Sequence, residues 1–144
     1  MPKVDNEVII NAPVEKIFNY ISQPRNLQQI WPSVVEIKNQ KLLSNGGYRY
    51  QWTYKMSGIH FTGTGECIDL VPNVVLTSKN TGAIESMVRF TFRSKENQTK
   101  VTLSIDYQVP SSLVGHFAET IILKMNDKEA ELILDNLRIL FEKS

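Results

Sequence analysis

The chain has 144 residues, of which 42% are hydrophobic and 22% charged, and this length suits one domain with a single core. Its 16 basic and 15 acidic residues give a formal net charge of +1, which argues against the basic face of nucleic-acid-binding proteins and the polybasic segments that dock on acidic membranes. The single cysteine, Cys67, excludes an intrachain disulfide and favours a reducing compartment.

The N-terminal part of the chain predicts one strand followed by two short helices. The strand is expected over residues 3–10. Pro13 suits the first turn of a helix, where its missing N–H costs nothing, and the apolar residues after it recur at helical spacing: Val14, Ile17, Phe18 and Ile21. A second short helix is expected from Pro24 to about Ile30, with Pro32 ending it.

The middle of the chain changes to a period of two, which is typical of strands with one solvent-facing side. Tyrosine, tryptophan and methionine alternate with polar residues over positions 48–56, and Ser57 and Gly58 mark a tight turn after them. Further strands are expected over residues 59–70, 74–81, 88–93 and 101–109.

After Pro110 the sequence predicts one long helix that ends near Lys143. Ser111 and Ser112 are N-cap candidates, and about 30 helical residues would span roughly 45 Å. The polar residues 126–129 interrupt the apolar face, so we expect a bend or a solvent-facing turn there. The apolar face is expected to comprise Leu113, Val114, Phe117, Ala118, Ile121 and Met125, then Leu132, Ile133, Leu137 and Leu140.

Together these elements predict an α+β fold of the helix-grip kind. Consecutive strands joined by short turns form an antiparallel meander, whose apolar face must be covered. Only the C-terminal helix is long enough to cover it. We therefore expect residues 1–144 to form a single domain in which a curved sheet wraps around this helix and the two short helices close one end.

The concave face of the expected sheet combines large aromatic residues with small ones. Gly63 and Gly65 share the inward register of Phe61, and Ser86 shares that of Val88. The pattern fits a filled core and equally an apolar ligand pocket in which tyrosine and tryptophan supply polar groups. The residues expected to line such a cavity are Trp31, Tyr50, Trp52, Tyr54, Phe61, Cys67, Ser86, Val88, Phe90, Leu103, Tyr107, Leu113, Phe117 and Ile121.

Motifs of the common enzyme classes are absent from the sequence. It has no G-x-S-x-G, H-E-x-x-H or Walker motif, and Gly63-Thr64-Gly65 lacks the third glycine of a dinucleotide fingerprint. Its one cysteine and two distant histidines do not suggest a metal site, and we expect no cofactor. Aromatic stripes can stack single-stranded bases, but the near-neutral charge lacks the backbone attraction that such binding needs.

The candidates for acid–base catalysis are His60, Asp69 or a tyrosine of the pocket. His60 is either a half-exposed strand histidine or, if a bulge turns it inward, an acid or base at the pocket mouth. Asp69 shares the inward register of Phe61 and is either a turn-capping residue or a catalytic carboxylate near the strand end. Cys67 is either a small buried apolar residue or a nucleophile.

The opening of the chain resembles that of START-like proteins. The segment Ile10-Asn11-Ala12-Pro13-Val14-Glu15-Lys16-Ile17-Phe18-Asn19-Tyr20-Ile21, continued by Asn26-Leu27 and Trp31-Pro32, is similar to the polyketide cyclase/dehydrase and lipid-transport branch of the START-like (SRPBCC) superfamily. The resemblance implies a seven-stranded sheet gripping the C-terminal helix and an internal cavity for lipids, sterols or polyketides. It provides no universal catalytic residue. Asp69-Leu70-Val71-Pro72 resembles the family's usual strand end, although Asn73 replaces a second proline, which favours a structural role for Asp69.

Three functions remain open at this point. The first is binding or transport of a small hydrophobic ligand, and the second is a cyclase or dehydratase reaction in the same cavity. The third is a protein-interaction module with a collapsed cavity, for which the outward positions of Ile9 and Met87 are weak indications. Without a signal-peptide core or a run of about 18 apolar residues, we expect a cytoplasmic protein with no stable membrane insertion. The oligomeric state is left open, a homodimer included.

Overall fold

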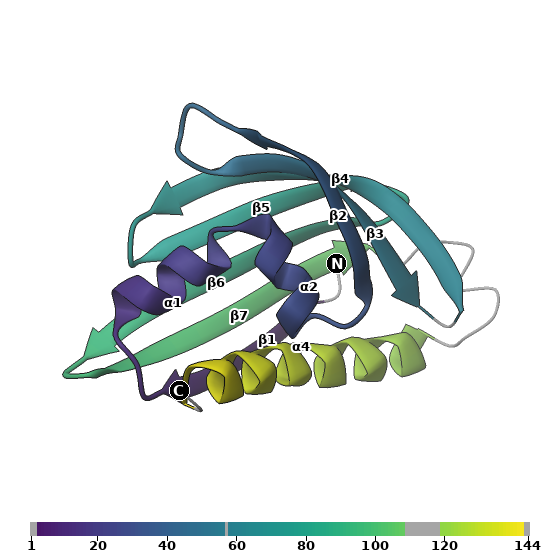
Figure 1. The fold of residues 1–144 in the computed structure, drawn as a ribbon. Coiled ribbons are helices and arrows are strands. Elements are labelled where there is room, and N and C mark those ends of the chain that lie inside the picture. Colours follow the sequence, from purple (N-terminus) through teal and green to yellow (C-terminus); the bar gives the residue numbers. More distant parts are fainter. Residues whose placement is uncertain (1–2, 57, 109–118, 143–144) are drawn as a thin grey trace.

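Seven antiparallel strands form one curved sheet, and the helices lie on one side of it (Figure 1). The computed structural model describes residues 3–56, 58–108 and 119–142. The helices are α1 (Val14–Ile21), the 3₁₀ helix η1 (Pro24–Asn26), α2 (Leu27–Ile30) and α4 (Glu119–Glu142). The strands are β1 (Lys3–Ile10), β2 (Val34–Leu42), β3 (Tyr48–Met56), β4 (Ile59–Val71), β5 (Val75–Gly82), β6 (Glu85–Lys95) and β7 (Gln98–Gln108).

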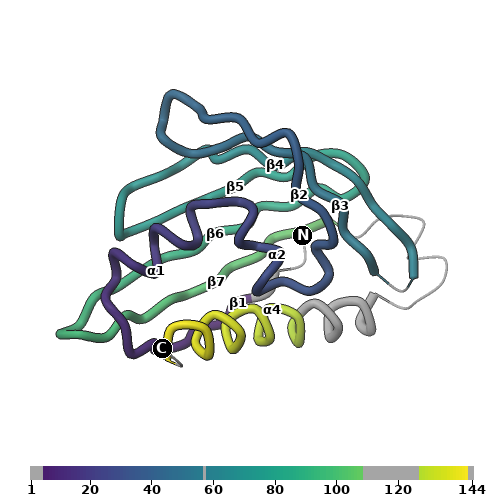
Figure 2. The backbone as a smooth tube through the Cα atoms, in the orientation of Figure 1, coloured from purple at the N-terminus to yellow at the C-terminus, as the bar shows by residue number. Residues whose placement is uncertain are grey.

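The strands are ordered β1-β7-β6-β5-β4-β3-β2 across the sheet. Strands β2 to β7 form a meander, and β1 pairs with β7 at the edge opposite β2, as the tube in Figure 2 shows. The short helical segments connect β1 to β2, and α4 follows the sheet. This architecture confirms the predicted helix-grip fold.

The part of the sheet next to α1 is a filled core. The apolar face of α1 is buried as predicted, and the ring of Phe18 packs edge-to-face on that of Phe92 with a centroid distance of 5.2 Å. Buried Thr99 donates a hydrogen bond to the carbonyl oxygen of Ala12 (2.8 Å), which anchors the loop before α1 to β7. The open space of the fold lies beyond the end of α1, between the sheet and the segment formed by η1 and α2.

Helix α4 packs against β1, β7 and α2 through a face that differs in part from the predicted one. The buried residues are Ala130, Ile133, Leu134 and Leu137, at the spacing of one helical stripe. Leu132 and Leu140, which were predicted on this face, are exposed. The side chain of Asn136 donates a hydrogen bond to the carbonyl oxygen of Ile30 (3.1 Å), so the end of α2 fixes the rotation of α4.

Helix α4 also runs without interruption through residues 126–129. Asp127 and Lys128 are exposed, as a solvent-facing turn would require, but Glu129 is half-buried on the sheet side. The predicted start of the helix at Ser111 or Ser112 lies outside the described residues, as do Leu113, Val114, Phe117 and Ala118. The side chains of Ile121 and Met125 are likewise outside the described part of the structure.

Candidate functional site

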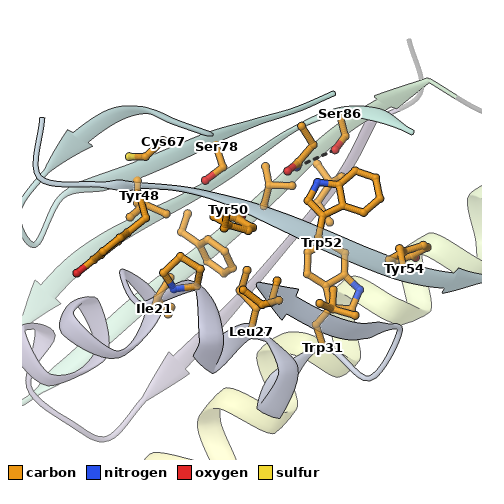
Figure 3. Close-up of a pocket in the computed structure, with 18 of the residues that line it drawn as sticks. Ile21, Leu27, Trp31, Tyr48, Tyr50, Trp52, Tyr54, Cys67, Ser78 and Ser86 are labelled. Atoms are coloured by element: carbon orange, nitrogen blue, oxygen red, sulfur yellow. Dashed lines mark hydrogen bonds between the residues drawn. The ribbon is translucent and has the colours of Figure 1, made fainter. Parts of the chain in front are cut away.

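A pocket lies between the concave face of the sheet and the segment from the end of α1 to α2, with Glu129 of α4 in its wall (Figure 3). Its cavity volume is about 100 Å³. Most of the lining is apolar or aromatic. The lining residues are Ile21, Ser22, Pro24, Leu27, Trp31, Val34, Ile37, Gly47, Tyr48, Tyr50, Trp52, Tyr54, Met56, Cys67, Leu76, Ser78, Asn80, Ile84, Ser86, Val88, Phe90, Ile105, Tyr107 and Glu129.

Two glycines of β4 allow aromatic rings of β3 to lie across the sheet. Gly63 is paired with Trp52 and Gly65 with Tyr50. A Cβ atom at Gly63 would be 2.3 Å from Cζ2 of the Trp52 ring, and one at Gly65 would be 2.6 Å from Cζ of Tyr50. Neither contact is sterically possible. Only glycine at these two positions therefore lets the rings lie close to the sheet, where they form part of the pocket wall.

Trp31, Tyr54 and Glu129 form a group that we call the carboxylate cluster. The Trp31 indole N–H donates a hydrogen bond to Glu129 Oε1 (2.6 Å), and the Tyr54 hydroxyl donates one to Glu129 Oε2. The two rings meet edge-to-face with a centroid distance of 6.0 Å. The cluster thus joins the end of α2, strand β3 and helix α4 at one wall of the pocket.

The phenol of Tyr54 is held in its protonated, donating form. Burial raises the pKa of Tyr54 well above its usual value, and the neighbouring charge of Glu129 and the hydrogen bond to it raise that pKa further. The Tyr54 hydroxyl therefore remains a donor to Glu129 at any physiological pH.

Four polar side chains cross the concave face in one register row, which we call the polar row. Strand pairing aligns Tyr50, Gly65, Asn80, Ser86 and Tyr107 from β3 to β7, and all of them except the glycine line the pocket. The amide of Asn80 donates a hydrogen bond to the Ser86 hydroxyl (3.0 Å; dashed in Figure 3). The polar row therefore provides hydrogen-bonding groups in the middle of an apolar wall.

Because the pocket tyrosines are buried, we expect the free energy of unfolding to fall at alkaline pH. Burial raises the pKa of Tyr50 to about 12, against the opposing effect of its hydrogen bond with Ser78. An unfolded tyrosine ionises near pH 10, so the unfolded state releases this proton first and stability is lost as the pH rises from about 10 to 12. Each such tyrosine contributes up to about 1.4 kcal/mol per pH unit in this window.

Urea denaturation at pH 8 to 11.5 would measure this loss. The free energy of unfolding should begin to fall above about pH 8.5, where the unfolded Cys67 thiol ionises, and should fall more steeply above about pH 10, where unfolded tyrosine ionises. Tyr50→Phe should make the fall shallower, because one of the coupled protons is removed. An equal slope in the wild type and in Tyr50→Phe would contradict the assignment to Tyr50.

Most of the sequence-predicted cavity residues lie around the pocket, but two do not. Phe61 is buried without lining it, and Leu103 is fully enclosed in the core. The side chains of Leu113, Phe117 and Ile121 are outside the described residues. Those that line the pocket are Trp31, Tyr50, Trp52, Tyr54, Cys67, Ser86, Val88, Phe90 and Tyr107. Whether they bind a ligand remains a prediction.

Of the candidate acid–base residues, His60 and Asp69 do not belong to the pocket, whereas tyrosines line it. His60 is exposed and pairs with Lys55 on the outer face of the sheet. Asp69 is exposed as well, because the β4–β5 register shifts between Cys67 and Asp69. Such an irregularity reverses the side-chain alternation after it, so the expectation of an inward Asp69 was wrong and Leu70 takes the more buried position.

Cys67 lines the pocket in a form poorly suited to nucleophilic attack. Its side chain is buried, and burial raises the pKa of the thiol above its usual value, which keeps it protonated. A Cβ atom at Gly47 would lie 2.4 Å from the Cys67 sulfur. Cys67 therefore acts as a small wall residue packed against the backbone of Gly47.

Sequence reasoning missed Glu129, the acidic side chain in the described pocket wall. It was grouped with the polar interruption of the C-terminal helix. Its spacing carried a usable signal, because Glu129 precedes Ile133 and Leu137 by four and eight residues and so shares their face. The polar lining residues Ser78 and Asn80 were also missed, since both lie in a short strand with little periodicity.

No group of three or more histidine, cysteine, aspartate or glutamate side chains among the described residues is placed to hold a metal ion. None of the helices in the described part of the chain is both long and apolar enough to cross a membrane.

The family model for polyketide cyclase / dehydrase and lipid transport proteins matches residues 1–142. The chain belongs to this family. The resemblance seen in the N-terminal segment is thus confirmed over nearly the whole sequence. No curated protein sequence matches the chain.

Solved structures share the fold of this family member at low sequence identity. A START superfamily protein from Mycobacterium smegmatis has a TM-score of 0.82 and 14% identity over 98% of this chain and 97% of that one. The Zhui aromatase/cyclase from Streptomyces sp. R1128 has a TM-score of 0.78 and 13% identity over 98% and 93%. The Aha1 dimer from Colwellia psychrerythraea has a TM-score of 0.66 and 16% identity over 99% and 97%. These likenesses establish the START-like fold alone.

Proposed function

We propose that the protein binds a small hydrophobic molecule, such as a lipid, sterol or polyketide-like compound, in the pocket between the sheet, α2 and α4. The observation that carries this proposal is the lining: apolar and aromatic side chains from β2 to β7 surround space that protein atoms leave open. Concave, mostly apolar sites with a few polar groups are the usual form of small-molecule sites. The family description, which includes lipid transport, supports the same function.

Binding would be driven by removal of the ligand's apolar surface from water, at roughly 25 cal/mol per Å². The rings of Trp31, Tyr50 and Trp52 offer broad, rigid contact surfaces for a flat or branched apolar body. The polar row would orient the ligand by hydrogen bonds. Binding of this kind needs no ionisable side chain in contact with the ligand.

Thermal unfolding with a panel of sterols, fatty-acid esters and aromatic polyketides tests the proposal. A ligand present at about one hundred times its Kd stabilises the folded state by about 2.7 kcal/mol and should raise Tm by roughly 10 °C. A protein whose Tm is unchanged by every compound in the panel would contradict the proposed binding function.

Acid–base catalysis in the same pocket, as in a cyclase or dehydratase, is a second candidate function. One observation favours it: the Glu129 carboxylate and the Tyr54 hydroxyl form a hydrogen-bonded pair in the pocket wall. Such a pair can accept and return a proton. Mass spectrometry of a bound polyketide-like ligand should then show loss of water that Glu129→Gln abolishes, and an unchanged ligand mass would contradict catalysis.

The pocket argues against an interaction module, since that hypothesis required a collapsed cavity. Its two surface indications are also unequal. Ile9 is 57% exposed, whereas Met87 is partly covered by its neighbours.

A further inference from the structure

The charges around the pocket have one sign. Among the described lining residues, Glu129 is the carboxylate and there is no lysine, arginine or histidine. The ion pairs between described residues lie elsewhere, and none of them includes Glu129. Its two oxygens accept hydrogen bonds from Trp31 and Tyr54. An anionic ligand would therefore meet a like charge and no compensating cation, whereas an uncharged ligand would leave the carboxylate cluster intact.

The pocket wall also contains a buried donor that lacks an acceptor. The indole nitrogen of Trp52 is buried and has no hydrogen-bond partner among the described residues, and Trp52 as a whole is only 8% exposed. Trp31, the other tryptophan of the chain, does have a partner in Glu129. A buried N–H without an acceptor is unfavourable, so a ligand that supplies an acceptor there gains affinity.

The position of this donor is fixed by the sheet. The benzene edge of the Trp52 indole lies over Gly63, where even a Cβ atom would collide with it. Figure 3 shows the indole on the same wall as Ser86, a member of the polar row. The donor therefore sits on a rigid wall next to the polar row.

We propose that the ligand is an uncharged, ring-sized molecule with an acceptor oxygen, such as a ketone carbonyl, that receives a hydrogen bond from Trp52 Nε1, and that Glu129 disfavours carboxylate ligands. This inference rests on the proposed binding function and adds the chemical class of the ligand. It names Trp52 as the orienting residue and Glu129 as the residue that sets charge selectivity.

Three probes of matched shape test the inference by isothermal titration calorimetry at pH 7. They are 2-acetylnaphthalene, 2-isopropenylnaphthalene, which replaces the carbonyl oxygen by CH₂, and 2-naphthoate. The ketone should bind roughly fivefold more tightly than the alkene. Trp52→Phe reduces the apolar contact surface for both probes, so the expected result is that the ratio of the two affinities falls to about one. Naphthoate should bind at least about 50-fold more weakly than the ketone, and Glu129→Gln should recover much of that loss.

A second readout does not use the Trp52→Phe variant. The two tryptophans give two indole N–H resonances in a ¹⁵N-correlated NMR spectrum, assigned with Trp31→Phe. The ketone should shift the Trp52 resonance strongly and the alkene should not. If ketone and alkene bind equally and neither shifts that resonance, or if naphthoate binds as well as the ketone, the inference is wrong while the binding function stands. If no probe binds at all, both fail for ring-sized molecules.

Discussion

Replacing Ser86 by tryptophan is expected to abolish ligand binding, with Kd raised at least about 100-fold. Ser86 is half-buried in the middle of the polar row, with Asn80 and Tyr107 as its neighbours across β5 and β7. An indole at this position would project into the cavity, whose volume is about 100 Å³. A ligand would then have to displace a packed side chain, and overpacking of that kind is unfavourable.

The matched control is Arg89→Trp, which places the same side chain on the exposed face of the same strand. Calorimetry with the tightest ligand from the thermal panel would compare the two variants, after circular dichroism has shown that both are folded. Arg89→Trp should bind as the wild type does. If Ser86→Trp retains wild-type affinity, the ligand does not occupy this pocket.

Replacing Glu129 by alanine is expected to lower the free energy of unfolding by roughly 2–3 kcal/mol. The substitution removes the acceptor of the Trp31 indole N–H and of the Tyr54 hydroxyl, and each hydrogen bond to a charged group contributes about 1.5–3 kcal/mol. The expected loss lies at or below the lower end of the sum of the two bonds because Glu129 is only half-buried and solvent weakens such interactions. Glu129→Gln keeps one acceptor oxygen and should lose about 1 kcal/mol.

Glu131→Ala is the control for the Glu129 variants, since Glu131 is exposed on the same helix and its removal should change stability by less than about 0.5 kcal/mol. Urea denaturation of all three variants would give the comparison. Equal stability of Glu129→Ala and Glu131→Ala would show that the carboxylate cluster does not hold α4 to β3.

Strand β2 was not predicted from the sequence, and its burial does not alternate. The other strands and the short helices could be predicted because their signals are local. Tyr50, Trp52 and Tyr54 are buried at every second position of β3, as the alternation required. The helical spacing from Val14 to Ile21 likewise identified the buried face of α1. In these segments the residue pattern agrees with the tertiary environment, so the local sequence is enough to predict the element and its buried face.

The errors arose where distant parts of the chain decide the outcome. The inward register of β4 holds to Cys67 and ends at the irregularity beside β5, so Asp69 faces solvent. The rotation of α4 depends on its contacts with β1 and α2, which leaves apolar Leu132 exposed. Glu129 lies in the pocket wall because it accepts hydrogen bonds from Trp31, at the end of α2, and from Tyr54 of β3. These donors are 98 and 75 residues away in sequence.

The open space itself could not be derived from residue types. The same aromatic and small residues could have filled the core, and the pattern left both outcomes open. Whether the core is filled or open depends on the distance between the sheet and its covering helices. It also depends on the two rings of β3 that lie against Gly63 and Gly65 of β4. Both are properties of tertiary packing.

The central claim is that a small hydrophobic molecule occupies the pocket, and intermolecular nuclear Overhauser effects test it most directly. The measurement uses the ligand that gives the largest thermal shift and methyl-labelled protein. The expected result is contact between ligand protons and the methyl groups of Val88 and Ile105, which line the pocket. Contacts only to exposed methyl groups such as those of Ile9 and Ile68, with none to Val88 or Ile105, would contradict the claim.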